Sequence, residues 1–561
     1  MRRSLVVLAA LTIALASSLP GSAVTGAAEA ESETFVVLFE EGASTEEGVA
    51  AVEAAGGDVV AVNDAVGLAT VTVANPDDFV AEVSADEAIF GAASNEVIGT
   101  TRPDERKFDD ERLQSERDAR RAEGSGSSKP DKGVEPLASL QWDMAMIDAT
   151  ADGSYDEQRG RKQVLVGIID TGIDGSHPDI AKNFNWKLSR NFTTDIPLID
   201  GDCALEADSS CEDPRNVDEN GHGTHVAGTV AAPLNKLGTA GVAPGVTLVN
   251  LRAGQDSGFF FLPAVVDALT YAGDKGIDVV NMSFYTDPWL YNCTMAADAD
   301  PAVTPDDLLE QQTIIEAHFR AMEYAHEHGV TLVGSLGNSH IDLGAAFKFD
   351  NTSPDFPPGE EIVRTVDNDC IDLPVEGPNV IGVSALGPTT AKADYSNYGV
   401  EQITVSAPGG YFRDGFGTPA FQTVGNLVLA PYPEAVGIEL GDIDANGEPT
   451  NDFVIKDCRG NTCAYYQYLQ GTSMAAPHVT GVVALIISEE GRSGRNGFGM
   501  DPRRVERILT RSATETGCPA INPFSYENVG RPAEYTALCQ GDEDFNGFYG
   551  AGIVNAEEAV D

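Results

Sequence analysis

Three short segments of this 561-residue sequence carry side chains that could support nucleophilic catalysis. Asp170 ends an apolar run, His222 stands between two glycines, and Ser473 leads into small and apolar residues typical of a helix. A serine hydroxyl becomes a nucleophile when an imidazole removes its proton, and a carboxylate fixes the tautomer and the charged form of that imidazole. The order Asp, His, Ser is one of the known orders of such a triad. The combination predicts acyl transfer by an activated serine.

Each of these residues taken alone has a simpler interpretation. Asp170 could cap a turn, and Ser473 could be an ordinary N-cap of the following helix. His222 and His225 could bind a metal ion, but no glutamate lies between them as in H-E-x-x-H, and their spacing is i, i+3. A histidine at the N-terminal end of a helix can instead accept a proton near neutral pH, whereas His225 is predicted to be structural. The triad is therefore supported by the combination and not by any one segment.

The three segments resemble the signatures of the subtilisin-like serine peptidases, the subtilase family. They read D-T-G at Asp170, H-G-T-H-V-A-G at His222 and G-T-S-M-A-A-P-H-V around Ser473. The resemblance implies that these residues form the catalytic triad of a secreted serine endopeptidase that hydrolyses peptide bonds of proteins through an acyl-enzyme. It covers most of residues 136–561 and implies the three-layer, subtilisin-like α/β fold.

The same resemblance marks residues that would hold the substrate. Asn338, at the end of V-G-S-L-G-N, would donate its side-chain amide to the oxyanion beside the backbone N–H of Ser473, and such a donor contributes about 3–4 kcal/mol. Members of the family pair an extended peptide with two backbone segments, which match 256–259 and 281–285 here. The second segment departs from the family pattern S-L-G-G by two bulky aromatic residues, which leaves the pocket shape open. The predicted substrate-binding residues are Ser257, Gly258, Ser283, Phe284 and Gly337.

Two candidate metal ligands also follow from the resemblance. Asp179 and Asn235 fall where many members of the family hold a calcium ion, which prefers oxygen ligands. Lys236 in the same loop argues against a tight site. A structural calcium ion at Asp179 and Asn235 is thus an expectation, whereas the hydrolysis itself is expected to need no cofactor.

Two other classes of protein remain open. An aspartic peptidase would use the D-[ST]-G triplets at Asp170 and Asp256, whose carboxylates would have to share one proton at low pH. Against this class, R-A-G-Q precedes Asp256 where a buried strand would be expected. A secreted binding or scaffold protein could keep the fold without turnover, although no triad residue is missing.

These side chains need a scaffold of alternating strands and helices. Beyond residue 135, apolar runs typical of strands buried on both faces alternate with helical segments, as in a parallel sheet covered by helices. The ends of such strands line the ligand crevice, which is where Asp170 lies. We predict one large α/β domain over 136–561, with surface insertions near 286–325 and 411–469. The apolar runs are Val164–Ile169, Thr247–Leu251, Val279–Met282, Val330–Gly334, Val380–Val383 and Ile403–Val405.

The first 135 residues are typical of an exported precursor. Residues 1–30 match a secretory signal, with two arginines, an apolar run too short to span a bilayer, and small residues leading to A-x-A. Residues 31–100 show the β-α-β-β-α-β order of a ferredoxin-like α+β domain. The resemblance implies that this domain is an inhibitory propeptide, which assists folding and is then removed. Residues 101–135 are charged and rich in Gly and Ser, which predicts an exposed, protease-accessible linker.

The composition limits the partners of the chain. Its 35 basic and 88 acidic side chains give a net charge of −53, which would repel nucleic acids and anionic membranes. No later apolar run reaches the length of a membrane-spanning helix. We expect an extracellular monomer that acts on proteins or peptides and binds its own propeptide. A well-solvated surface, tolerance of salt, cation binding and a preference for basic substrates all remain compatible with the charge.

The eight cysteines of an exported chain predict disulfides. Close spacing favours Cys203–Cys211, Cys458–Cys463 and Cys518–Cys539, which leaves Cys293–Cys370 as the fourth pair. Metal binding is the weaker interpretation, because no C-x-x-C pair occurs and the histidines do not cluster with the cysteines.

Overall fold

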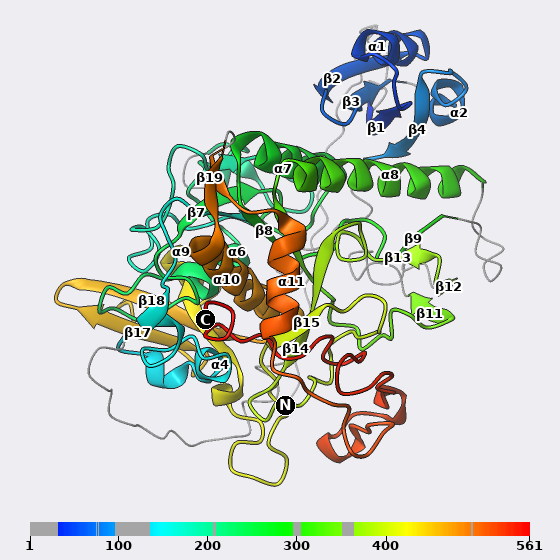
Figure 1. The fold of residues 1–561 in the computed structure, drawn as a ribbon. Coiled ribbons are helices and arrows are strands. Elements are labelled where there is room, and N and C mark those ends of the chain that lie inside the picture. The colour runs from blue at the N-terminus through cyan, green and yellow to red at the C-terminus, as the bar shows by residue number, and fades with distance from the viewer. Residues whose placement is uncertain are drawn as a thin grey trace, which may run out of the picture.

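The computed structural model describes residues 32–95 except 75 and 77, and residues 135–205, 209–294, 305–350, 364–494 and 497–561. They form a small N-terminal domain and a large α/β domain (Figure 1). The predicted signal peptide and almost all of the predicted linker lie outside the described residues, so both stay predictions. Within the described residues, no helix is long and apolar enough to cross a membrane.

The N-terminal domain is a four-stranded antiparallel sheet with two helices. Its elements follow one another as β-α-β-β-α-β, as predicted, and the strands lie in the order β2-β3-β1-β4. The first helix begins at a capping box in which Ser44 and Glu47 satisfy each other's backbone N–H groups. The elements are β1 (Glu33–Phe39), α1 (Thr45–Ala54), β2 (Gly57–Asn63), β3 (Leu68–Val73), α2 (Phe79–Val83) and β4 (Ile89–Ser94).

The large domain is built on a seven-stranded sheet in which every pair of neighbours is parallel. The strand order is β15-β14-β10-β8-β5-β7-β6, so the chain passes from β5 to β7 on one side and then back to β8 on the other. Such a reversal leaves a crevice at the carboxyl end of β5, where ligands bind in open α/β sheets. The strands are β5 (Leu165–Ile169), β6 (Arg190–Asn191), β7 (Thr247–Arg252), β8 (Val279–Met282), β10 (Thr331–Ser335), β14 (Val380–Leu386) and β15 (Val405–Pro408).

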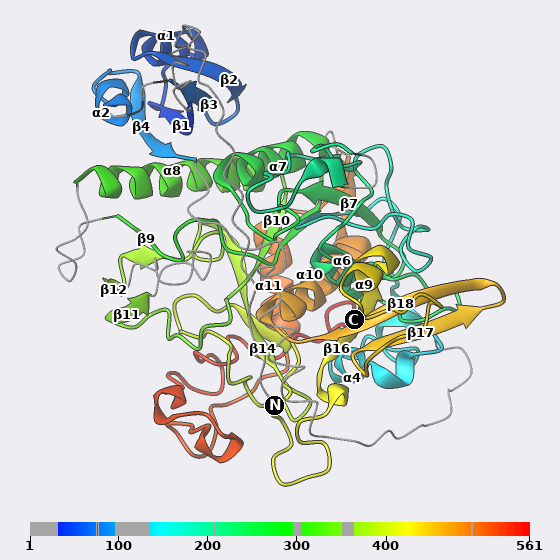
Figure 2. The same cartoon turned by 180° about the vertical axis from the view of Figure 1, so that it is seen from behind.

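Helices cover both faces of this sheet and complete the predicted three-layer α/β fold (Figures 1 and 2). On one face, α7 (Leu262–Lys275) and α8 (Pro305–Glu327) share a buried apolar cluster with the strands. On the other face, α6 (His222–Ala231), α10 (Thr472–Glu490) and α11 (Pro502–Ser512) share a second cluster. Residues 472–488 of α10 are all buried, as expected for a helix that is apolar all round.

The two predicted insertions differ in structure. Residues 286–325 were expected on the surface, but α8 occupies 305–327 and buries Ile314, Ala317 and Ala321 in the core. The region 411–469 forms a three-stranded antiparallel sheet in the order β16-β18-β17, together with a short helix, α9. Its elements are β16 (Val428–Tyr432), α9 (Glu434–Glu439), β17 (Val454–Arg459) and β18 (Thr462–Leu469).

Short elements complete the large domain. The helices are α4 (Trp142–Met146) and α5 (Ser154–Glu157), and the strands are β9 (Asn292–Cys293), β11 (Phe347–Asp350), β12 (Arg364–Asp367), β13 (Cys370–Ile371), β19 (Arg492–Gly494) and β20 (Gly497–Gly499). All eight cysteines form disulfides, and the four predicted pairs are confirmed. Three of the bridges close short local loops, whereas Cys293–Cys370 joins β9 to β13.

The N-terminal domain lies against α7 and α8 (Figure 2). Val36, Leu38 and Ala93 of its sheet belong to the same apolar cluster as these two helices. Arg320 of α8 donates to the backbone oxygen of Phe39 at 2.7 Å, and Asn63 Nδ2 donates to Asp267 Oδ1 of α7 at 2.7 Å. Apolar burial and directed hydrogen bonds therefore hold the two domains together.

Candidate active site

Asp170 and His222 form a buried pair at the carboxyl end of the sheet. Asp170 directly follows β5, and His222 is the first residue of α6. His222 Nδ1 lies 2.7 Å from Asp170 Oδ1, and at most 1% of either side chain is exposed. A hydrogen bond from Nδ1–H to the carboxylate leaves Nε2 of the imidazole as the atom that can take up a proton.

The glycines beside His222 explain how the sequence folds at this point. Gly221 has φ of +99°, a backbone conformation that favours glycine. A Cβ atom on Gly223 would lie 2.1 Å from the backbone oxygen of Gly172, so only glycine lets α6 approach the turn after β5. Both glycines are thus required for the contact between the imidazole and Asp170.

Ser473 is the second residue of α10, at the N-terminal end of a 19-residue helix. Its hydroxyl donates to the backbone oxygen of Ser283 at 3.3 Å, and Ser283 Oγ donates to the backbone oxygen of Ser473 at 3.0 Å. Asn281 Nδ2 donates to Ser283 Oγ at 2.8 Å, and Asn281 Oδ1 accepts from Thr480 of α10 at 2.9 Å. These bonds fix the start of α10 on the end of β8, and the helix dipole adds positive potential around Ser473.

Asn338 is held by the first residue of α10. Its Oδ1 accepts from the backbone N–H of Thr472 at 2.9 Å and from Thr472 Oγ1 at 3.0 Å. Thr472 Oγ1 in turn accepts from the backbone N–H of Gly337 at 3.0 Å. Gly337 has φ of +93°, and a Cβ atom there would lie 2.6 Å from Asn397 Nδ2. The sequence alone does not identify Thr472, because its role depends on this contact between distant segments.

The predicted substrate segment 256–259 is attached to the loop before His222. Ser257 donates through its backbone N–H and its hydroxyl to Asp200 Oδ1, at 2.9 and 2.7 Å. Asn220 Nδ2 donates to the backbone oxygen of Asp256 at 2.9 Å. Gly258 has φ of +92°, which closes the turn. The segment therefore has a defined position relative to the imidazole.

The side chain of Phe284 is not exposed to a substrate. Its ring is buried and stacks on Phe260 with 4.0 Å between the ring centroids. Only the backbone at this position could meet a peptide. The bulk of the Phe284 side chain therefore lies in the core and not in a substrate pocket.

Comparison with known proteins decides the family. The model of the subtilase family, Peptidase_S8, matches residues 161–552. The chain belongs to the subtilase family. Among its relatives, fervidolysin of Fervidobacterium pennivorans is 29% identical over 378 residues, which are 66% of this chain and 40% of that protein. Subtilisin DY of Bacillus licheniformis is 29% identical over 354 residues, which are 63% of this chain and 85% of that protein. The chain thus spans less than half the length of fervidolysin.

Solved structures show that the fold is shared. The epidermin leader peptide processing serine protease of Staphylococcus aureus superposes with a TM-score of 0.60 at 19% identity, over 95% of this chain and 99% of that chain. Fervidolysin superposes with a TM-score of 0.55 at 22% identity, over 96% of this chain and 62% of that chain. These similarities support the subtilisin-like architecture of the mostly parallel α/β domain.

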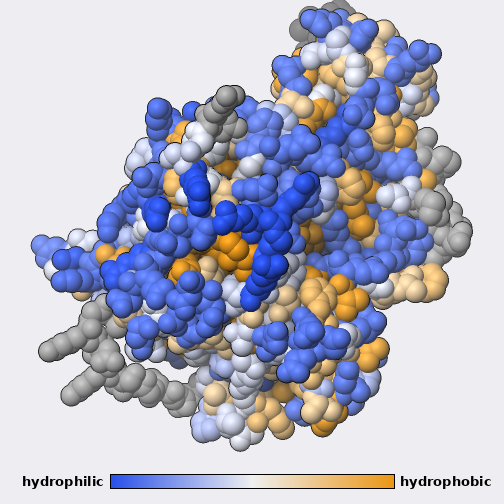
Figure 3. All heavy atoms as spheres, in the orientation of Figure 1, coloured by the Kyte–Doolittle hydropathy of each residue, from blue (hydrophilic) through white to orange (hydrophobic). Residues whose placement is uncertain are grey.

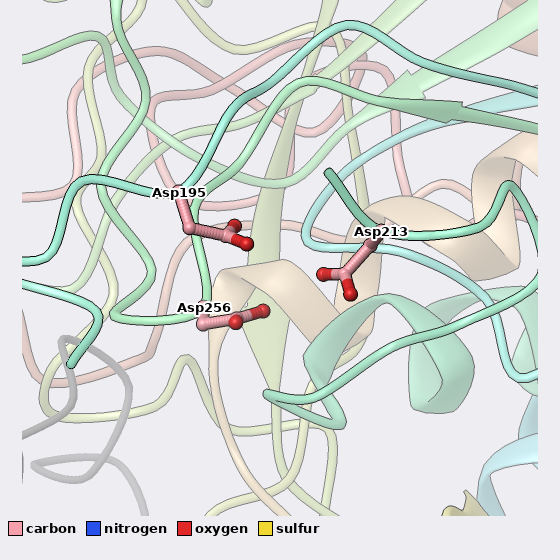
Figure 4. A group of neighbouring side chains, drawn as sticks. All are labelled: Asp195, Asp213 and Asp256. Carbon is pink, nitrogen blue, oxygen red and sulfur yellow. The ribbon is translucent and has the colours of Figure 1, made fainter. Parts of the chain in front are cut away.

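The aspartic-peptidase alternative does not fit this subtilase. Its two candidate carboxylates do not pair, because Asp170 contacts His222 while Asp256 contacts Arg252 at 2.8 Å. Figure 4 shows Asp256 converging with Asp195 and Asp213, a group of buried carboxylates with the geometry of a metal site. The buried guanidinium of Arg252 hydrogen-bonds to all three side chains. An arginine therefore already supplies the positive charge that a cation would bring.

The predicted calcium ligands of the subtilase meet, but as hydrogen-bonding partners. Asn235 Nδ2 donates to Asp179 Oδ1 at 2.8 Å, while Asp179 Oδ2 accepts from the backbone N–H of Thr239 and from the hydroxyl of Tyr466, each at 3.1 Å. The ring of Tyr466 fills the space beside Gly238, where a Cβ atom would lie 1.8 Å from its hydroxyl. Burial raises the pKa of Asp179 to about 8. Asn235 Oδ1 is buried without a hydrogen-bond partner among the described residues, so an oxygen of the kind that calcium prefers remains beside Asp179. A calcium ion at Asp179 and Asn235 therefore stays a prediction.

Two further histidines of the subtilase brace helices α6 and α10, which carry His222 and Ser473. His225, predicted to be structural, is buried in α6, and its Nε2 lies 3.2 and 3.1 Å from the backbone oxygens of Val428 and Gln467. His478 of α10 lies 3.1 Å from Asp143 Oδ2 through Nε2 and 2.8 Å from the backbone oxygen of Met474 through Nδ1. The sequence analysis did not identify the contact between Asp143 and His478, because 335 residues separate them.

Proposed function

We propose that this subtilase is a secreted serine endopeptidase that cleaves proteins or peptides through an acyl-enzyme. The observation that carries the proposal is the buried Asp170–His222 pair, with 2.7 Å between Oδ1 and Nδ1, at the end of β5. Helix α10, which carries Ser473 in its first turn, packs against α6, which carries His222. The seven-stranded sheet and its covering helices thus supply one crevice for acid–base chemistry and for a nucleophile.

The reaction begins with transfer of the Ser473 Oγ proton to His222 Nε2 as Oγ attacks the carbonyl carbon of the scissile bond. Asp170 accepts from Nδ1–H and stabilises the imidazolium that forms. His222 then gives the proton to the leaving amine, which departs and leaves Ser473 acylated. A water molecule repeats the two steps, with His222 as base and then as acid, and releases the second product.

Two donors would stabilise the negative charge on the carbonyl oxygen. One is the backbone N–H of Ser473 at the start of α10. The other is Asn338 Nδ2, because the amide oxygen of Asn338 is already engaged by Thr472. Preorganised donors of this kind stabilise the transition state more than the substrate.

Before attack, the Ser473 hydroxyl must turn from the backbone oxygen of Ser283 toward the imidazole. The bond to Ser283 is 3.3 Å long, which is weak for an O–H donor, so this rotation costs little. A substrate strand lying along 256–258 and Ser283 would use backbone groups of both segments. We propose Ser257, Gly258, Ser283 and Gly337, together with the backbone of Phe284, as its binding residues.

The N-terminal domain is proposed to be an inhibitory propeptide that helps the large domain fold and is then removed. Its apolar contact with α7 and α8 and its bonds through Arg320 and Asn63 support a specific complex. The signal-like residues 1–30 and the four disulfides favour an oxidising, extracellular location. We expect a monomer whose chemistry needs no cofactor.

Replacement of Ser473 by Ala tests the proposal. We expect the Ser473→Ala variant to lose about 10⁶-fold in kcat on casein and to keep its N-terminal domain attached. A serine-directed fluorophosphonate should label the processed wild type at Ser473 and leave the variant unlabelled. Cleavage of casein by the variant would contradict the proposal, and a wild type that is neither labelled nor active would support a scaffold without turnover.

A further inference from the structure

A cavity of about 1010 Å³ lies beside the loop that leads to His222. Glu219 lines it and lies three residues before His222, and Asp256, which begins the proposed substrate segment, lines it as well. The other walls come from the turn after β5, from residues 200–202, and from the insertion that contains α9 and the start of β18. The cavity thus adjoins both the loop before His222 and the start of the proposed substrate segment.

The charge of the cavity has one sign. Eight of its lining residues are acidic, and none is lysine or arginine. His177 also lines it, but burial lowers the pKa of this histidine, which favours the neutral ring. Burial and, to a smaller extent, nearby carboxylates raise the pKa of Asp256 to about 8 despite the opposing effect of Arg252. The acidic residues are Asp174, Asp200, Asp202, Asp218, Glu219, Asp256, Glu434 and Glu439.

One wall of the cavity is apolar. Pro433, Ala435, Val436 and Ile438 contribute to it, and Ile438 is 53% exposed. A space with acidic groups and an apolar wall is suited to a long aliphatic side chain with a cationic end, which buries its methylene groups and keeps its charge near carboxylates. A bare metal ion would gain nothing from this wall.

The acidic walls have a defined position relative to the catalytic histidine. Asp200 accepts two hydrogen bonds from Ser257, and Asn220 donates to the backbone of Asp256. Asp218 Oδ1 accepts from the backbone N–H of Gly221, the residue before His222, at 2.8 Å. A side chain held in the cavity would therefore set the position of the peptide at the imidazole.

We propose that this cavity receives a lysine or arginine side chain of the substrate, so that the enzyme prefers peptides with a basic residue close to the scissile bond. The inference rests on the proposed endopeptidase function, because a peptide along 256–258 is what brings a side chain to the cavity. The acidic insertion helix α9 supplies Glu434 and Glu439, and the loop before His222 supplies Glu219. The negative potential would also attract basic peptides over a distance.

The test compares matched peptides cleaved by the processed enzyme. One library places arginine at each position around the scissile bond, and a second replaces that arginine by citrulline, which has the same shape without the charge. We expect kcat/KM for the arginine peptide to exceed that for the citrulline peptide by at least about tenfold at one position. Added salt should reduce this ratio, because it screens the attraction.

Variants of residues that line the cavity test whether the preference for a basic side chain depends on this cavity. The double variant Glu219→Gln with Glu434→Gln should bring the arginine-to-citrulline ratio of kcat/KM close to one. The single variant Glu434→Lys should also lower this ratio, and it changes only an exposed residue, whereas Glu219 is half-buried. Glu506→Gln with Glu543→Gln is the matched control, since both glutamates are exposed and neither lines the cavity. The control should keep the ratio of the wild type.

Labelling of Ser473 by a fluorophosphonate distinguishes the two ways in which the test can fail. An enzyme that is labelled and cleaves both peptides equally would overturn the preference for basic residues and leave the endopeptidase function intact. A preference that survives in the cavity variants would overturn the assignment to this cavity. A processed chain that is neither labelled nor active would overturn the proposed function and this inference with it.

Discussion

The functional side chains are positioned by the ends of regular elements. Asp170, Ser283 and Asn338 follow β5, β8 and β10, which are neighbours in the parallel sheet, whereas His222 and Ser473 lie in the first turns of helices. The carboxyl ends of parallel strands meet along one edge, so segments distant in sequence converge there. Each motif could therefore be recognised locally, while the bonds between motifs could not.

Thr472 is the residue at which such a bond can be tested. In Thr472→Val the side chain keeps its shape but loses the hydroxyl that donates to Asn338 Oδ1 and accepts from Gly337. We expect kcat on a peptide substrate to fall about tenfold with little change in KM, because a less well oriented Asn338 weakens stabilisation of the oxyanion and not binding of the ground state.

Two further variants serve as controls for Thr472→Val. Asn338→Ala removes the amide completely, and we expect kcat to fall by about 10²–10³-fold. Thr472→Ser keeps a hydroxyl at position 472 and should therefore retain most of the wild-type activity. A rise in KM at constant kcat in Thr472→Val would show that the residue shapes substrate binding instead.

At the scale of elements, the sheet β16-β18-β17 braces helix α6, which carries His222. Its backbone oxygens face His225, and the backbone oxygen of Tyr465 lies 3.1 Å from His177 Nε2. Pro431 of β16 packs so closely that a Cβ atom on Gly228 of α6 would lie 2.1 Å from its Cδ. The sequence predicted an insertion over 411–469 but not this contact, because the register of a sheet against a remote helix depends on tertiary packing.

Tyr466 shows what this sheet contributes to the domain. Tyr466→Phe removes the hydroxyl that donates to Asp179 Oδ2 and leaves the ring in place. We expect the free energy of unfolding, measured by chemical denaturation, to fall by about 1–2 kcal/mol. Calcium chloride should raise the thermal midpoint of the wild type and EDTA should lower it, because Asp179 and Asn235 Oδ1 offer oxygen ligands of the kind that calcium takes.

Tyr535→Phe, at a half-buried position, provides the matched control for the loss of a hydroxyl. Calcium could also bind elsewhere on a chain with a net charge of −53, so Asp179→Asn is needed as a second control. If calcium raises the thermal midpoint of the wild type but not that of Asp179→Asn, the ion binds at Asp179. An equal rise in both proteins would show that it binds elsewhere.

At the scale of the whole molecule, the sequence predicted the features that depend on local pattern. Apolar runs such as Val279–Met282 marked strands buried on both faces, and the close spacing of Cys458 and Cys463 marked a disulfide. It did not predict that α8 would cover the sheet, because the polar residues of this helix make its amphipathic pattern weak. It also missed the contact between His478 and Asp143, since two buried polar residues find each other only in the folded chain.

Buried carboxyl groups make the stability of the domain depend on pH. Asp278 accepts from the backbone N–H of Leu165 at 2.8 Å, and burial raises its pKa from 3.8 to about 7. Between these values the folded state holds a proton that the unfolded state has lost, so the contribution of Asp278 to stability falls as pH rises, by about 1.4 kcal/mol per pH unit. Asp278→Asn keeps an acceptor and cannot ionise.

Denaturation of wild type and Asp278→Asn from pH 4 to pH 8 should therefore show a difference in the free energy of unfolding that grows in favour of the variant up to about pH 7 and then levels off. Asp544→Asn, at an exposed position, should change the free energy by less than about 0.5 kcal/mol across the range. A difference between wild type and Asp278→Asn that stays constant with pH would show that Asp278 is ionised in the folded state.

The contact between the two domains is expected to set how long the N-terminal domain stays bound after the proposed cleavage of the linker. Arg320 donates to the backbone oxygens of Phe39 and Val66, at 2.7 and 3.4 Å, and its guanidinium lies 5.6 Å from the ring centroid of Phe90. Arg320→Ala removes these contacts but spares the apolar cluster, so we expect the domain to dissociate about tenfold faster.

The lag before peptidase activity appears in freshly processed protein should shorten accordingly, while the unfolding of the mature domain stays as in the wild type. Arg511→Ala, at an exposed position of α11, should leave the lag unchanged. An unchanged lag in Arg320→Ala would mean that the remaining contacts, apolar burial and the hydrogen bond of Asn63 to Asp267, determine the lifetime of the complex.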